Sequence, residues 1–85
     1  MAFVYILRCS DGSLYTGVAK DLVARLRRHQ SGRASRYTRG RLPVTLVWQR
    51  QFANWGEGLR EERRIKALRR RAKEALLETD VEATD

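Results

Sequence analysis

Cysteine, histidine and proline each occur once in the 85-residue sequence. Because Cys9 is the only cysteine and His29 the only histidine, the chain contains neither a disulfide framework nor a Cys/His zinc cluster. A single cysteine is typical of proteins in a reducing compartment, and we expect a cytoplasmic protein. The longest apolar run, residues 2–7, is far shorter than the roughly 20 residues that span a bilayer. We therefore expect no signal peptide and no membrane anchor.

Carboxylates are scarce before residue 74, which limits the chemistry available to the chain. They are Asp11, Asp21, Glu57, Glu61 and Glu62. This set is too small for the carboxylate cluster that a two-metal phosphodiesterase requires. The sequence also has no nucleophile elbow, P-loop or dinucleotide-binding fingerprint.

Positive charge is abundant, with 18 basic and 10 acidic side chains and a net charge of +8. All of the basic residues precede residue 74, and the segment 20–41 is the densest, with arginine outnumbering lysine. Such a field attracts polyanions, with nucleic acid favoured over an anionic membrane. The candidate contacts in this segment are Arg27, Arg28, Arg36, Tyr37, Arg39 and Arg41. Tyr37 is a candidate for stacking on a base or for covering the edge of the core.

The length suits one domain, which we place at residues 1–77, followed by an acidic tail at 78–85. Patterning predicts strands at 3–8, 14–18 and 44–52, with a loop at 32–42. It also predicts helices at 22–30, with Asp21 as N-cap, and at 57–68, with a further helix to about residue 77. This order of elements indicates an α+β fold.

The hairpin loop decides whether Tyr5 and Tyr15 share a face of the sheet. A two-residue loop at 11–12 places the two tyrosines on opposite faces. A three-residue loop at 10–12, with Gly12 left-handed, pairs Tyr5 with Gly17 and places both tyrosines on one face. Local sequence leaves both alternatives open.

Three charged or titratable side chains fall beside apolar helical faces. Arg25 and His29 border the buried stripe of the first helix, where Arg25 either extends along the surface or reaches a site. His29 either satisfies a backbone carbonyl or takes part in that site. Glu62 falls between two apolar positions of the later helix, whereas Glu61 falls outside them; an inward carboxylate needs an arginine or a divalent ion as partner.

Five short motifs follow one another in the order and spacing of a known family. They are Val4-Tyr5-Ile6, Tyr15-Thr16-Gly17, the helix with Arg25 and His29, the segment RYTRG at 36–40, and GLREERRIKAL with Glu62. On these motifs residues 4–77 resemble the GIY-YIG nuclease superfamily, in particular its small stand-alone bacterial members. Phe3 and Thr16 depart from the glycine and isoleucine of the motifs. The resemblance implies a three-stranded antiparallel sheet flanked by helices, with both tyrosines on one face and hence the three-residue loop.

The resemblance also implies roles for the site residues. Tyr5 would be the general base toward water, and Tyr15 would support Tyr5 or the phosphate. Arg25 would hold the scissile phosphate, with His29 as proton relay or second phosphate contact. Glu62 would hold a single Mg²⁺ or Mn²⁺ ion. Gly17 would let the backbone or the substrate approach closely at the site.

The expected function is that of a divalent-metal-dependent endonuclease cutting DNA in preference to RNA, selective for DNA structure or guided by a protein partner, with DNA repair as its setting. The first alternative is a nucleic-acid-binding module with a degenerate site. The second is an interaction subunit that contacts a protein through Trp48, Trp55 or the acidic tail.

Overall fold

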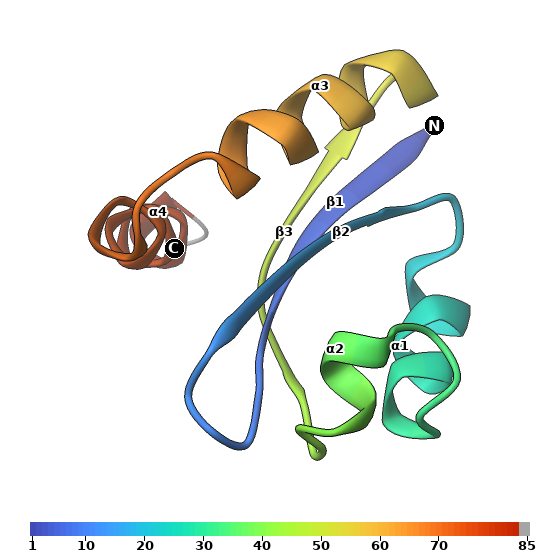
Figure 1. Cartoon of the computed structure of the whole chain (residues 1–85). Coiled ribbons are helices and arrows are strands. Elements are labelled where there is room, and N and C mark those ends of the chain that lie inside the picture. The colour runs from blue at the N-terminus through green and yellow to red at the C-terminus, as the bar shows by residue number, and fades with distance from the viewer. Residues whose placement is uncertain (84–85) are drawn as a thin grey trace.

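The computed structural model describes residues 1–83. Its elements are β1 (Ala2–Arg8), β2 (Leu14–Ala19), α1 (Leu22–Gln30), α2 (Arg36–Arg39), β3 (Thr45–Phe52), α3 (Trp55–Lys66) and α4 (Arg70–Ala83). The strands form one antiparallel sheet in the order β2-β1-β3. Helices α3 and α4 lie on one side of the sheet, and α1 and α2 lie on the other (Figure 1). The predicted α+β fold is confirmed.

Helix boundaries follow from local capping. The carboxylate of Asp21 accepts a hydrogen bond from the amide of Ala24 at 3.0 Å, and α1 has the predicted bounds. The side chain of Asn54 accepts from the amide of Glu57 at 2.9 Å, so α3 begins two residues before its predicted start. The segment predicted to be a loop contains the one-turn helix α2, and α4 continues past residue 77 to Ala83.

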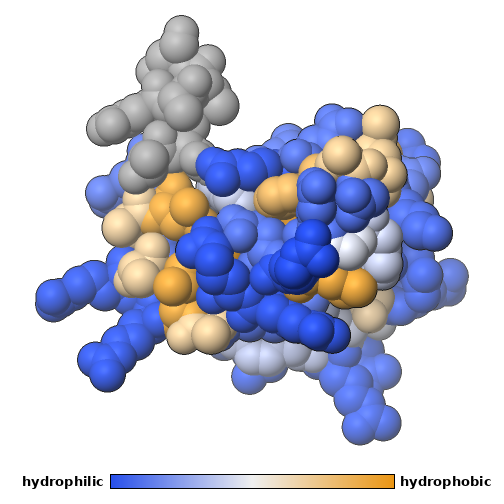
Figure 2. Space-filling model, turned by 90° about the horizontal axis from the view of Figure 1, so that it is seen from above, coloured by the Kyte–Doolittle hydropathy of each residue, from blue (hydrophilic) through white to orange (hydrophobic). Residues whose placement is uncertain are grey.

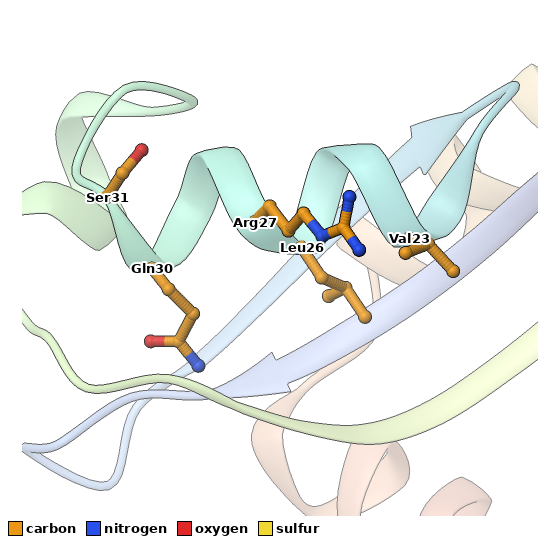
Figure 3. Close-up of a pocket in the computed structure, with 5 residues that line it drawn as sticks. All are labelled: Val23, Leu26, Arg27, Gln30 and Ser31. Atoms are coloured by element: carbon orange, nitrogen blue, oxygen red, sulfur yellow. The ribbon is translucent and has the colours of Figure 1, made fainter.

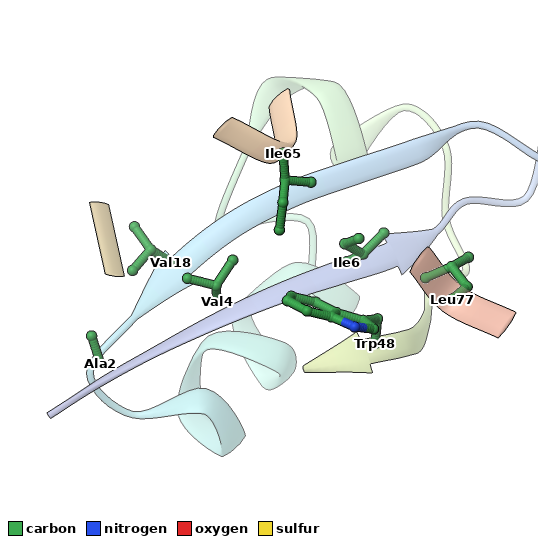
Figure 4. Packing of buried hydrophobic residues seen from close by; sticks show 7 residues of the cluster. All are labelled: Ala2, Val4, Ile6, Val18, Trp48, Ile65 and Leu77. Carbon is green, nitrogen blue, oxygen red and sulfur yellow. The ribbon is translucent and has the colours of Figure 1, made fainter. Parts of the chain in front are cut away.

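The larger core lies between the sheet and helices α3 and α4 (Figure 4). Its buried side chains are Ala2, Val4, Ile6, Val18, Trp48, Ile65 and Leu77. Helix α3 approaches the sheet closely at Gly58, where an added Cβ would lie 2.8 Å from the Cβ of Ala2. Trp48 is 4% exposed, so the suggestion that it contacts a protein partner is wrong: its ring is part of the core.

The hairpin has the three-residue loop that places both tyrosines on one face. Tyr5 pairs with Gly17 and Leu7 pairs with Tyr15. Gly12 has a φ of 85°, a left-handed conformation that favours glycine, and its amide donates to the carbonyl of Cys9 at 2.9 Å. Tyr5 and Tyr15 therefore face α1 and α2 together, as the family resemblance implied.

The surface seen from above is mostly hydrophilic, with long polar side chains projecting outward and small hydrophobic areas between them (Figure 2). Among the described helices, none is both long and apolar enough to cross a membrane.

Candidate active site

The phenol of Tyr5 lies against Gly17 of the neighbouring strand. Tyr5 is 0% exposed. A Cβ added at Gly17 would collide with the Tyr5 hydroxyl and lie 2.5 Å from Cζ. Because β2 is the edge strand of the sheet, the absence of a side chain at Gly17 leaves space for the tyrosine hydroxyl close to this edge. The close approach expected at Gly17 is thus made by Tyr5 itself.

A chain of hydrogen bonds runs from Tyr5 through His29 to Thr38. The Tyr5 hydroxyl lies 2.8 Å from His29 Nε2, and His29 Nδ1 lies 2.9 Å from Thr38 Oγ1. Because the carbonyl of Ser35, at 3.4 Å, is available to accept the proton of the Thr38 hydroxyl, we assign this hydroxyl as the acceptor from Nδ1–H. Nε2 then carries the free lone pair, and Tyr5 donates to it.

Burial of these groups fixes their charge. Burial raises the pKa of the Tyr5 phenol to about 12; Arg25 acts in the opposite direction, and the charge of Glu62 adds to the rise. Burial also lowers the pKa of His29, and the charges of Arg25 and Arg28 lower it further. Near neutral pH the pair is therefore a protonated phenol hydrogen-bonded to a neutral imidazole.

His29 is 1% exposed, and both of its ring nitrogens are hydrogen-bonded to protein side chains. No nitrogen of the ring is left to meet a phosphate. A direct phosphate contact by His29 would therefore require one of these two hydrogen bonds to break, whereas a proton relay would use them as they are. The alternative that His29 satisfies a backbone carbonyl is wrong, because Tyr5 and Thr38 are its partners.

A stack of aromatic rings covers the site beside the hairpin loop. The ring of Tyr15 makes an edge contact with His29 at 5.2 Å between centroids and stacks on Tyr37 at 5.9 Å. The guanidinium of Arg41 lies 3.9 Å from the Tyr37 ring and is ion-paired to Asp11 at 3.0 Å. Tyr37 thus contacts both Tyr15 and Arg41, and Arg41 links the hairpin loop to α2.

Arg25 stands at the rim of this cluster, half-buried, on the same helix as His29. Its guanidinium donates to the carbonyl of Val18 at 3.4 Å, and a side-chain hydrogen bond between Arg25 and the Tyr5 phenol opposes the rise of the Tyr5 pKa. The guanidinium thus lies beside the Tyr5 hydroxyl, where its fork can also receive an anion.

Glu62 and Glu61 are equally buried, each with a side chain 15% exposed, although the helical pattern placed Glu61 outside the apolar arc. Both oxygens of Glu61 accept from Arg64, at 2.7 Å each, and these hydrogen bonds lower its pKa. Glu62 has a longer ion pair, 3.4 Å to Lys66. Glu62 is therefore the more available carboxylate, and its charge acts on Tyr5 from α3.

The donor set around Glu62 restricts how a metal could bind. Among residues 1–78, the part of the chain with described side chains, no group of three or more histidine, cysteine or acidic side chains could hold an ion. One carboxylate suffices for Mg²⁺, which keeps most of its water and takes oxygens from a substrate phosphate. The residues thus fit a single Mg²⁺ or Mn²⁺ that is completed by substrate.

A separate hollow of about 530 Å³ lies along α1, where Leu26 and Gln30 point from the helix toward the strands (Figure 3). It is lined by Val23, Leu26, Arg27, Gln30 and Ser31. Gln30 points toward the start of β3, where it exchanges hydrogen bonds with the backbone of Val44 at 2.5 and 3.3 Å. Neither Tyr5 nor His29 lines this hollow, so it is distinct from the hydrogen-bonded cluster.

Thr38 is the residue that our sequence analysis missed. It is 0% exposed and lies 9 residues beyond His29. The threonine is part of the RYTRG motif, but composition and spacing gave it no role, because its partner depends on how α2 packs against α1.

Comparison with known proteins agrees with this geometry. The family model for the GIY-YIG catalytic domain matches residues 1–75. UPF0213 proteins of Staphylococcus aureus strains Mu50 and N315 are each 48% identical over 75 residues, covering 88% of this chain and 92% of theirs. The solution NMR structure of a UPF0213 protein from Bacillus halodurans is 45% identical, with a TM-score of 0.62, over 93% of this chain and 85% of that chain. The chain therefore belongs to the GIY-YIG superfamily of nucleases, in the group of small single-domain UPF0213 proteins.

Proposed function

We propose that this protein is a divalent-metal-dependent nuclease that hydrolyses phosphodiester bonds in DNA. The observation that carries the proposal is the buried chain Tyr5–His29–Thr38, in which the tyrosine hydroxyl lies 2.8 Å from Nε2 of an imidazole whose pKa is lowered by burial. A binding module has no use for such a proton path, whereas hydrolysis needs a group that accepts a proton from water.

The high pKa of Tyr5 shapes the proposed mechanism. At a pKa of about 12 the phenolate is hardly populated near neutral pH, so Tyr5 alone is a poor base. His29 resolves this difficulty, because its Nε2 accepts the phenol proton as the phenol oxygen accepts one from water. The resulting hydroxide attacks phosphorus, the bond from phosphorus to the leaving oxygen breaks, and that oxygen takes a proton from solvent.

The remaining residues bind and orient the substrate. The guanidinium of Arg25, which lies beside the Tyr5 phenol, would hold the scissile phosphate and stabilise the charge that develops on its oxygens. Glu62 would hold a Mg²⁺ or Mn²⁺ ion, which supplies Lewis-acid stabilisation of the phosphate when bound. Tyr5 is fully buried, and its ring packs against Tyr15, which stacks on Tyr37, so side chains around the phenol would have to move on substrate binding before water could reach it.

Cleavage assays test the proposal directly. End-labelled single-stranded, duplex and branched DNA, and RNA of the same sequence, are incubated with Mg²⁺, Mn²⁺ or EDTA. We expect metal-dependent cutting of DNA that Tyr5→Phe and Glu62→Gln reduce at least 100-fold. Glu61→Gln is the matched control, because it changes the same charge on the same helix at equal exposure, and it should retain the activity.

Two outcomes would contradict the proposal. Cutting that survives both Tyr5→Phe and Glu62→Gln belongs to a different site or to a contaminant. Salt-sensitive binding of every nucleic acid with no cutting would favour the binding module, and cutting of RNA alone would overturn the choice of DNA.

A further inference from the structure

A second hollow, of about 400 Å³, lies between the end of α1 and α2. Its lining residues are Gly32, Arg33, Ala34, Ser35, Arg36 and Arg39. It contains no carboxylate, and none of its three guanidinium groups is ion-paired to a side chain that the structure describes. The hollow therefore concentrates positive charge that nothing in the described fold neutralises.

The backbone around this hollow is held in place by local contacts. Gly32 has a φ of 77° and donates to the carbonyl of His29 at 3.0 Å, and the amide of Arg33 donates to the carbonyl of Arg28 at 2.8 Å. The stem of Arg39 lies across Gly32, 3.4 Å from where a Cβ would be. Gly32 thus supplies both the turn and the space for Arg39, and the arginines project from a fixed loop.

The hollow and the candidate active site share one short segment. On its inner side α2 holds Thr38 against His29, and on its outer side it carries Arg36 and Arg39. Figure 1 shows α2 beside α1, the helix that also carries Arg25. The hollow therefore lies at the end of the helix that carries Arg25, on the same side of the sheet. By contrast, Arg41 is ion-paired to Asp11 and is not part of the hollow.

We propose that the hollow formed by Arg33, Arg36 and Arg39 is a phosphate subsite. It would take a backbone phosphodiester of the strand being cut, near the scissile phosphate. The proposal rests on the proposed function for its substrate. Guanidinium forks match the geometry of phosphate oxygens, and charge-assisted hydrogen bonds of this kind are the stronger class.

Nitrogen-15 NMR titration with short ligands tests the subsite without any cleavage. The protein is titrated in EDTA with a tetrathymidylate, with the same tetramer bearing uncharged methylphosphonate linkages, and with inorganic phosphate. We expect the side-chain Nε–Hε signals of Arg33, Arg36 and Arg39 to shift with the diester tetramer and to stay unchanged with the methylphosphonate. The diester should also bind more tightly than inorganic phosphate.

Two charge-matched variants complete the test. Changing Arg33, Arg36 and Arg39 together to glutamine should weaken binding of the diester tetramer about 10-fold or more, given the usual strength of hydrogen bonds to charged groups. Changing Arg60, Arg63 and Arg71 together to glutamine removes the same charge from exposed positions on α3 and α4, and should weaken binding less than 3-fold. The NMR signal of His29 reports in each variant whether the fold is intact.

Three results would overturn the subsite: equal losses in the two variants, shifts confined to other arginines, or inorganic phosphate binding as tightly as the tetramer. The last result would mark an anion site with no preference for a strand. Because the titration needs no cutting, a protein that binds in this way but never cleaves would refute the nuclease and leave the subsite standing.

Discussion

The hydrogen bond from His29 to Thr38 makes a specific prediction about the tautomer of a single histidine. Thr38→Val keeps the shape of the side chain and removes the hydroxyl that accepts from Nδ1–H. The donor then lies in the core without a partner, since His29 is 1% exposed. Thr38 is a positioning residue in this proposal: it acts on Tyr5 through the imidazole and touches no substrate.

The expected magnitudes follow from burial. An unpaired buried donor costs about 1–3 kcal/mol, so Thr38→Val should lower the free energy of unfolding by about that amount. Once Nδ1 is unpaired, the imidazole is free to carry its proton on Nε2, which removes the acceptor for the Tyr5 proton. A general base contributes about 10²- to 10⁴-fold, and a partly populated wrong tautomer should lower the cleavage rate about 10- to 100-fold.

Because the chain has one histidine, every histidine signal in a nitrogen-15 NMR spectrum comes from His29. In protein labelled with nitrogen-15 histidine, we expect wild type to show a protonated Nδ1 and an unprotonated Nε2. Thr38→Val should show mixed or reversed signals, and Thr38→Ser should restore both the wild-type pattern and the rate. Thr45→Val, at an exposed position of β3, is the control for the same chemical change.

If Thr38→Val keeps the wild-type tautomer and cleaves within 2-fold of wild type, the Thr38 hydroxyl does not set the tautomer of His29. If Thr38→Ser loses activity as severely as Thr38→Val, the effect comes from packing and not from the hydroxyl. The tautomer is measured without cleavage, so it tests the hydrogen-bond chain even if the nuclease proposal is wrong.

Three further predictions concern the same site and the sheet beneath it. Gly17→Ala should displace the Tyr5 hydroxyl, lowering stability by about 1–3 kcal/mol and the cleavage rate at least 10-fold, whereas Gly40→Ala, with nothing within 4 Å of its new Cβ, should change neither. The hydroxyl of Thr16 is buried and has no hydrogen-bond partner among the described residues, so Thr16→Val should raise the urea midpoint by an amount equivalent to about 1 kcal/mol; a lower midpoint would show that the hydroxyl has a partner. Because the pKa of His29 is lowered in the folded state, the unfolded chain binds the proton more readily: stability should be full above about pH 6.5 and fall as the pH drops below it. Urea titrations between pH 5 and 7.5 measure this slope, which should flatten in His29→Gln.

Much of the fold follows from patterns within a few residues of each other. The bounds of α1 follow from Asp21 and the glycine turn after Gln30, since capping hydrogen bonds join groups three or four residues apart. The short helix α2 escaped prediction, because one turn between glycines has no periodicity to detect. The hairpin loop was ambiguous locally, and only the family resemblance selected the three-residue form that the structure has.

The sequence by itself determined the three strands, the helices other than α2, the concentration of positive charge and the family, because these depend on residue types and on short-range spacing. The tertiary structure decided which side chains meet. It brought His29 into hydrogen-bond contact with Tyr5, 24 residues away, and with Thr38. It also buried Glu61 as deeply as Glu62 and paired Glu61 with Arg64. These outcomes depend on how helices pack on the two faces of the sheet. The packing is stabilised by many weak apolar contacts between segments that are distant in the sequence, so no local sequence pattern predicts it.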